Sequence, residues 1–133
     1  MSSAVIDASA LLAYLGNEKG AEIVEKAIAQ GVFLSTINWT EVLSKLSDRG
    51  QDIKSIVMEL TSSGLIAGAI ELCPFTVDDS QIAAQLRLKT KSLGISLADR
   101  ACLALALRLK LPVLTSDRSW TQLKLGITIR DIR

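Results

Sequence analysis

The chain contains no histidine among its 133 residues. This absence removes the commonest general base and the commonest transition-metal ligand, and it excludes every Ser-His and Cys-His nucleophile scheme. Only two cysteines are present, Cys73 and Cys102, which are too few and too far apart for a thiolate metal site, so we expect small buried side chains. The sequence also lacks the glycine-rich loops typical of nucleotide binding. Carboxylate and metal chemistry remain.

Long apolar runs are missing as well. No stretch approaches the roughly 20 consecutive apolar residues of a membrane span. The residues before Asp7 lack the basic start of a signal peptide. We therefore expect a soluble, cytoplasmic protein with no membrane contact. Because 49% of the 133 residues are hydrophobic, the chain is long and apolar enough to bury one core, and we expect a single domain over residues 1–133.

Charge is balanced overall but uneven along the chain. The 15 lysines and arginines against 14 acids give a net charge of +1. Residues 1–66 carry eight acids and five bases, whereas residues 67–133 carry six acids and ten bases, so the second half is the one that would face an anion. Arg87, Lys89, Lys91 and Arg100 in this half are either a solvated helix face or contacts to phosphate groups.

Short apolar runs alternate with segments of helical periodicity. We expect strands at 4–6, 32–37, 71–75, 112–115 and 127–132, with the third and the last at sheet edges. We expect helices at 8–15, 19–30, 38–49, 51–63 and 78–93, and a nearly all-apolar helix over 101–109 that a capping box at Ser96 and Asp99 opens. A short helical turn is expected to start at 117–118. This alternation predicts an α/β protein, a three-layer α/β/α fold with a mainly parallel central sheet.

Four acidic residues stand at the expected helix starts: Asp7, Glu41, Asp99 and Asp117. Three of them closely follow an expected strand, and the carboxyl ends of parallel strands share one edge of a sheet, so we expect the acids to converge. Carboxylates that crowd together repel and raise one another's pKa unless a cation lies between them. Oxygen ligands favour Mg²⁺ or Mn²⁺, so the sequence predicts a divalent-metal site.

Each carboxylate also has an ordinary structural explanation. Asp7 and Asp117 are favoured N-cap residues, and Glu41 and Asp99 would complete capping boxes that begin at Asn38 and Ser96, interactions worth about 1 kcal/mol each. Helix capping does not explain why the acids gather at one edge within apolar sequence. Together the four favour a site.

Small hydroxyl residues lie beside these acids. Ser9, Thr115 and Ser119 would hold metal-bound water, or they are helix caps, which are equally common. Trp39 and Trp120 are expected in the core or in an interface rather than stacked on bases.

Four stretches, residues 5–13, 40–42, 97–101 and 114–120, carry a family resemblance through their order and spacing. In them the chain resembles the PIN-domain ribonucleases, and most closely the VapC toxins of type II toxin–antitoxin systems. The resemblance extends over essentially the whole chain. It implies a PIN-like fold, metal-dependent RNA cleavage, a homodimer and inhibition by a small antitoxin protein. The candidate catalytic and metal residues are then Asp7, Glu41, Asp99 and Asp117, with Asp7 and Asp99 as direct ligands of Mg²⁺ or Mn²⁺.

Two alternatives stay open. A signalling receiver domain also gathers acids around Mg²⁺ at a sheet edge, but it uses paired acids after the first strand and a lysine after the last core strand. Here Asp7 has no acidic neighbour, and Asp117 stands where that lysine would be useful. The second alternative is a PIN-like module that binds RNA or a protein without cutting.

Overall fold

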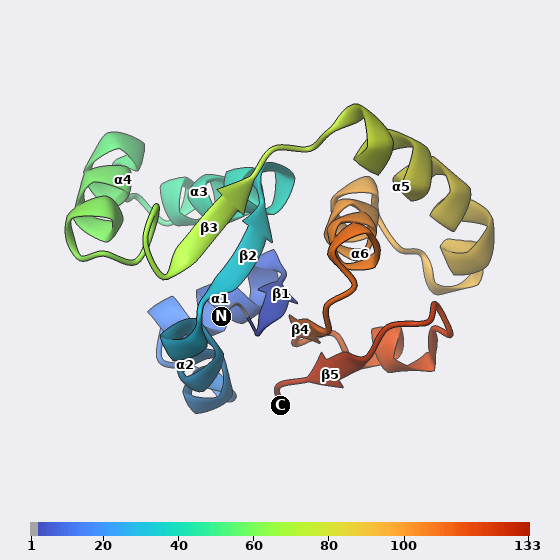
Figure 1. Cartoon of the computed structure of the whole chain (residues 1–133). Coiled ribbons are helices and arrows are strands. Elements are labelled where there is room, and N and C mark those ends of the chain that lie inside the picture. The colour runs from blue at the N-terminus through green and yellow to red at the C-terminus, as the bar shows by residue number, and fades with distance from the viewer. Residues whose placement is uncertain (1–2) are drawn as a thin grey trace.

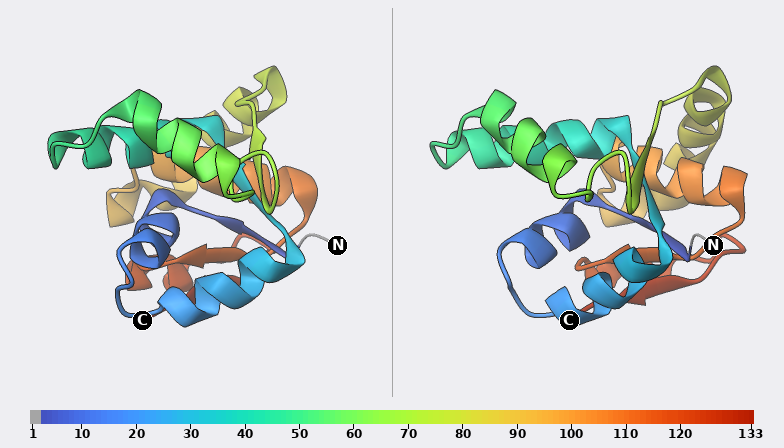
Figure 2. Two further views of the ribbon diagram at one scale, coloured as in Figure 1. Left: turned by 90° about the vertical axis from the view of Figure 1, so that its left-hand side faces the viewer. Right: turned by 60° about the vertical axis from the view of Figure 1, so that its left-hand side comes forward.

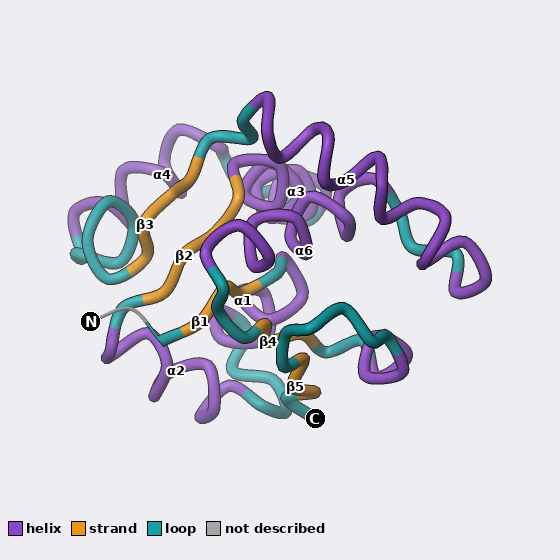
Figure 3. The backbone as a smooth tube through the Cα atoms, turned by 45° about the vertical axis from the view of Figure 1, so that its right-hand side comes forward, coloured by secondary structure: helices purple, strands orange, loops and turns teal. Residues whose placement is uncertain are grey.

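The computed structural model describes residues 3–133, so residues 1 and 2 of the expected domain lie outside the described part. Its centre is a five-stranded sheet in the order β3-β2-β1-β4-β5 (Figure 3). The strands are β1 (Ala4–Ile6), β2 (Val32–Ser35), β3 (Ile70–Cys73), β4 (Val113–Thr115) and β5 (Ile129–Asp131). Every pairing between them is parallel, which confirms the predicted parallel sheet and the two edge strands.

Helices cover both faces of this sheet, which confirms the predicted three layers. One face carries α1 (Ala8–Leu15), α2 (Ala21–Gln30), α3 (Thr36–Asp48) and α4 (Ile53–Ser62). These helices form a row in which α1 lies between α2 and α3 (Figure 2). The other face carries α5 (Val77–Thr90) and α6 (Leu97–Leu109), which lie together in Figure 1. Two short 3₁₀ helices, η1 (Lys91–Leu93) and η2 (Arg118–Gln122), complete the described elements.

Strand β1 shows how the sequence divides the core. Ala4 and Ile6 pack into the cluster under α1 to α4, whereas Val5 between them packs against α6 on the other face. Side chains of a strand alternate between faces, so a fully apolar strand is buried on both sides. The connection after β1 runs over one face and the connection into β4 runs over the other. The carboxyl ends of β1 and β4 therefore flank a switch point, where α/β folds form a binding crevice.

Helix α3 begins earlier than the sequence predicted. Its N-cap is Ser35, whose side chain accepts a hydrogen bond from the backbone N–H of Ile37. The expected strand 32–37 therefore ends at Ser35, and the expected capping box between Asn38 and Glu41 is wrong. The cause is the sheet register, because Ser35 is the last β2 residue that pairs with β3, opposite Cys73.

Helix α5 also differs at both ends from the expected 78–93. It starts after Thr76, which forms a capping box with Asp79 that the sequence analysis missed. It ends at Thr90, where the chain tightens into η1. The capping box at Ser96 and Asp99, by contrast, is present as predicted, and α6 is apolar and buried along most of its length.

Other expectations about the interior are confirmed. Trp39 and Trp120 are buried core residues, and Cys73 and Cys102 are buried free thiols. Within residues 3–133, none of the helices combines the length and the apolar character needed to cross a lipid bilayer.

Candidate functional site

A pocket of about 120 Å³ lies at the carboxyl edge of the sheet, and all four predicted acids line it. Asp7 directly follows β1, and Asp117 follows β4 by two residues. Glu41 comes from the second turn of α3, and Asp99 from the first turn of α6, which packs against α3. The remaining lining residues are Ala8, Ser9, Lys45 and Trp120. Acids that lie up to 110 positions apart in the sequence thus share one small cavity.

Asp7 is the most enclosed of the four, with 5% of its surface exposed. Its Oδ1 accepts hydrogen bonds from Ser9 Oγ at 2.7 Å and from the backbone N–H of Ala10 at 2.8 Å. Its Oδ2 accepts from Thr115 Oγ1 at 2.6 Å. Asp7 is therefore the N-cap of α1, as the structural explanation predicted. It is also bonded to the end of β4, a contact that capping alone does not require.

Burial raises the pKa of Asp7 from 3.8 to about 6, although hydrogen bonds from Thr115, Ser9 and Ala10 lower it, and the nearby charge of Asp99 raises it slightly further. The carboxylate is thus mostly ionised at neutral pH, at a cost in free energy. The pKa of the Cys102 thiol is raised chiefly by burial and then by the charges of Asp7, Asp99 and Glu41.

The predicted hydroxyl residues contact the acids directly. Ser9 and Thr115 both donate to Asp7. The bond from Thr115 to Asp7 links the ends of β4 and β1. Thr115 Oγ1 also accepts from the backbone N–H of Asp117 at 3.1 Å, within the turn that follows β4. Ser119 donates from Oγ to Asp117 Oδ1 at 2.7 Å. The hydroxyls therefore hold the carboxylates in place, whether or not they also bind water.

Glu41 is not a helix cap, because it lies inside α3. Its Oε1 accepts a hydrogen bond of 3.0 Å from Nδ2 of the buried Asn38. One turn further along α3, the exposed Lys45 also lines the pocket and supplies its one positive charge within residues 3–133. The sequence analysis missed Lys45, although its i+4 spacing from Glu41 places both side chains on one helix face.

The donor set fits a hard divalent cation. Four carboxylates offer oxygen ligands of the type that Mg²⁺ and Mn²⁺ prefer, and Asp7 is buried without a bonded cation of its own. In the described part of the chain, however, no three acidic or cysteine side chains already form a closed metal cage. The pocket is therefore an open acidic site, not a closed cage.

The predicted basic residues do not lie in this pocket. Arg87 and Lys89 are exposed near the end of α5, and Lys91 is exposed at the start of η1. Arg100 is different, because only 8% of its surface is exposed and its Nη1 donates to the backbone carbonyl of Ala83 on α5 at 2.8 Å. The expectation that Arg100 belongs to an exposed basic face is therefore wrong. Arg100 ties α5 to α6 inside the protein.

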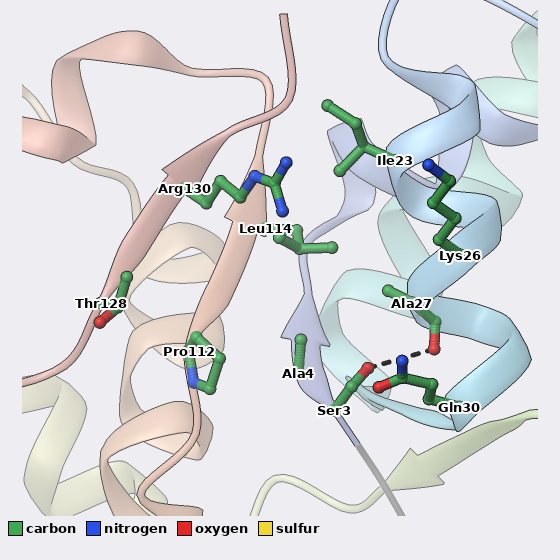
Figure 4. A pocket seen from close by; sticks show the side chains of 10 residues that line it. All are labelled: Ser3, Ala4, Ile23, Lys26, Ala27, Gln30, Pro112, Leu114, Thr128 and Arg130. Atoms are coloured by element: carbon green, nitrogen blue, oxygen red, sulfur yellow. Dashed lines mark hydrogen bonds between the residues drawn. The ribbon is translucent and has the colours of Figure 1, made fainter.

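A larger cavity of about 410 Å³ lies at the opposite, amino edge of the sheet, between α2 and strands β4 and β5 (Figure 4). Lys26 and Arg130 stand on its two sides, and apolar side chains such as Ile23 and Leu114 also line it. Both cations are exposed, and the lining contains no acid. The larger volume does not outweigh the converging acids, because size alone supplies no chemistry.

Comparison with known proteins adds an independent observation. The model of the PIN domain family matches residues 4–125. No curated protein sequence gives a match to the chain. Among solved structures, a toxin–antitoxin complex from Klebsiella pneumoniae contains a similar chain, with TM-score 0.74, 21% identity and 98% of each chain covered.

Two further structures have the same fold. A FitAcB complex from Neisseria gonorrhoeae matches with TM-score 0.71 and 22% identity over 96% of each chain. A DNA-bound VapBC complex from Salmonella typhimurium matches with TM-score 0.71 and 14% identity over 100% of each chain. At these sequence identities the likeness shows a shared fold and nothing more.

Proposed function

Because the chain belongs to the PIN domain family, we propose that it is a metal-dependent endoribonuclease and the toxin of a toxin–antitoxin pair. The observation that carries the proposal is the pocket shared by Asp7, Glu41, Asp99 and Asp117. Family membership also removes the receiver-like alternative. The substrate we propose is RNA, cleaved at its phosphodiester bonds.

In this proposal Asp7 and Asp99 are direct ligands of Mg²⁺ or Mn²⁺, and Glu41 and Asp117 bind directly or through water. A divalent ion held there supplies electrophilic activation of the scissile phosphate and of the attacking water. Glu41 would orient that water. Ser9 and Thr115 hold the Asp7 carboxylate, and Ser119 holds Asp117, so these two ligands are oriented by hydroxyl groups. The chemistry requires no protein nucleophile, in agreement with a chain that has no histidine.

The direct test incubates the purified chain with structured and single-stranded RNAs, with Mg²⁺, with Mn²⁺ and with chelator. Asp7→Asn and Asp99→Asn should each lower the cleavage rate on the order of 10²-fold or more, because an amide keeps the size of the side chain but loses the charge. Asp52→Asn is the matched control, since Asp52 is an exposed N-cap of α4. Wild-type rates in both site variants, or full cleavage in chelator, would refute the assignment.

The remaining alternative is a PIN-like module that binds without cutting. It predicts that RNA is retained intact with either metal, and that the site variants bind as tightly as wild type. The same incubation therefore separates the two functions, provided that bound and cleaved RNA are both measured.

We also propose a small antitoxin partner that docks along α3 and α4 and places an Arg or Lys among the acids. Two side chains of α4 support this surface, because Met58 is 70% exposed and Ile53 is 43% exposed. Purification from the native host should then yield a short second protein. Met58→Glu should lose it, whereas Val77→Glu, an exposed apolar position on α5, should keep it. Repeated isolation of free, active protein would contradict the partner.

Three further parts of the proposal concern the whole chain. Residues 1–133 act as one domain, two copies form a homodimer, and the protein works in the cytoplasm. Light scattering at micromolar concentration tests the dimer, and a mass of one chain at every concentration would refute it.

A further inference from the structure

Asn38 is a buried side chain that joins two of the acid-bearing helices. Only 1% of its surface is exposed. From α3, its Nδ2 donates to Glu41 Oε1 at 3.0 Å and to the backbone carbonyl of Ala98 on α6, also at 3.0 Å. Ala98 directly precedes Asp99. One amide group therefore fixes a carboxylate of one helix to the backbone beside the carboxylate of another, across 60 positions of sequence.

We propose that Asn38 is a positioning residue, which holds the Glu41 carboxylate in register with Asp99 and thereby raises the affinity of the pocket for a divalent cation. This inference rests on the proposed function, because it assumes that the acids bind metal. Asn38 does not line the pocket, so it would act through Glu41 and not as a ligand.

The physical reason lies in the flexibility of a glutamate. A free glutamate side chain loses rotamer entropy when it is fixed, so a carboxylate that is already held loses less on binding a cation. Asn38 engages one oxygen of Glu41 and leaves Oε2 for the cation or its water. The amide nitrogen thus donates two hydrogen bonds, one to Glu41 and one to Ala98. An aspartate would present only acceptors there, and an aliphatic residue would leave both acceptors without this donor.

The two ends of the Asn38 amide differ in their hydrogen bonding. Within the described residues, the buried Oδ1 of Asn38 has no hydrogen-bond partner. A buried polar atom without a partner destabilises a protein, so the two hydrogen bonds of Nδ2 come with an opposing cost.

The competing explanation is that Asn38 only ties α3 to α6 through Ala98. A double-mutant cycle on metal affinity separates the two, because a residue that acts through Glu41 loses its effect once Glu41 is removed. The four proteins are wild type, Asn38→Ala, Glu41→Ala and the double variant. The probe is Mn²⁺ alone, titrated by calorimetry. Thr90→Ala is the matched control, since Thr90 is a buried residue whose side chain bonds within α5.

We expect Asn38→Ala to weaken Mn²⁺ binding about tenfold in the wild-type background. In the Glu41→Ala background the same substitution should change the affinity less than twofold, and Thr90→Ala should leave it unchanged. Equal losses in both backgrounds, or no loss in the first, would overturn the inference. If circular dichroism finds Asn38→Ala unfolded, Asn38→Ser takes its place with the same expected pattern. Failure of wild type to bind Mn²⁺ would instead refute the metal site of the proposed function.

Discussion

Replacing the buried carboxylate of Asp7 should stabilise the metal-free protein at neutral pH. Burial raises the pKa of Asp7 from 3.8 to about 6, which corresponds to about 3 kcal/mol by which folding disfavours the ionised form. Asp7→Asn removes that charge and keeps an oxygen that caps α1, because Asn and Asp are equally good N-caps. Its Nδ2 cannot accept the hydrogen bond that Thr115 Oγ1 donates to Oδ2 of Asp7, so part of the gain is offset. For a chain of this size the melting temperature should rise about 5–10 °C at pH 7.5 in chelator.

The stability gained by Asp7→Asn should depend on pH. Between pH 3.8 and about 6 the folded state keeps a proton on Asp7 that the unfolded state has released, so the stability of wild type falls as pH rises through this window. Below pH 3.8 the carboxyl group of Asp7 is neutral in both the folded and the unfolded state, so it does not affect stability. Above about pH 6 it is ionised in both states, and the folded state bears the full free-energy cost of the buried charge. The advantage of Asp7→Asn should therefore be large at pH 7.5 and close to zero at pH 4.

Thermal or urea unfolding at the two pH values, in chelator and in Mn²⁺, completes the assay. A bound ion should stabilise wild type by mass action, about 2.7 kcal/mol at 100 times the dissociation constant, and should stabilise the variant much less. Asp52→Asn replaces an exposed N-cap that accepts from the backbone N–H of Ser55 and does not line the pocket, so metal should not alter its small effect. A stability difference between wild type and Asp7→Asn that is the same at pH 4 and pH 7.5 would refute the reasoning.

Three other substitutions test separate parts of the structure. Alanine at Arg87, Lys89 and Lys91 together should weaken RNA binding for all sequences and reduce its salt slope by about 2, and an unchanged slope would mean that these charges are only solvated. Arg108→Met should cost about 3 kcal/mol in urea unfolding, because it leaves Asp79, which is 2% exposed, without the partner at 2.6 Å. Adding Asp79→Asn should restore part of that loss, and no recovery would contradict the buried-charge explanation. Gly20→Ala should destabilise more than Gly50→Ala by about 1 kcal/mol or more, although both glycines have positive φ, because only at Gly20 would the new Cβ lie 2.4 Å from the carbonyl oxygen of Ile132. Equal melting temperatures for the two glycine variants would rule out that close approach.

Local sequence was sufficient where the interaction itself is local. The capping box of Ser96 and Asp99 joins residues three positions apart, so it could be read from the chain before the fold was known. Asp7 as the N-cap of α1 is a prediction of the same kind. The convergence of the acids also followed from sequence, because strand and helix alternation imposes a parallel sheet whose strands end at one edge.

Tertiary structure decided those features for which the local sequence allowed more than one outcome, such as the N-cap of α3 and the burial of Arg100. Ser35 and Asn38 are both capable caps, and pairing of Ser35 with β3 made it the cap while Asn38 became buried against Ala98. Arg100 looked like a surface charge, but its partner is a carbonyl 17 positions away on another helix. Sequence by itself determined which acids reach the carboxyl edge, since periodicity and capping are short-range. Only the packing of α3, α5 and α6 determined how those acids are held, because hydrogen bonds between helices depend on distances that no local pattern contains.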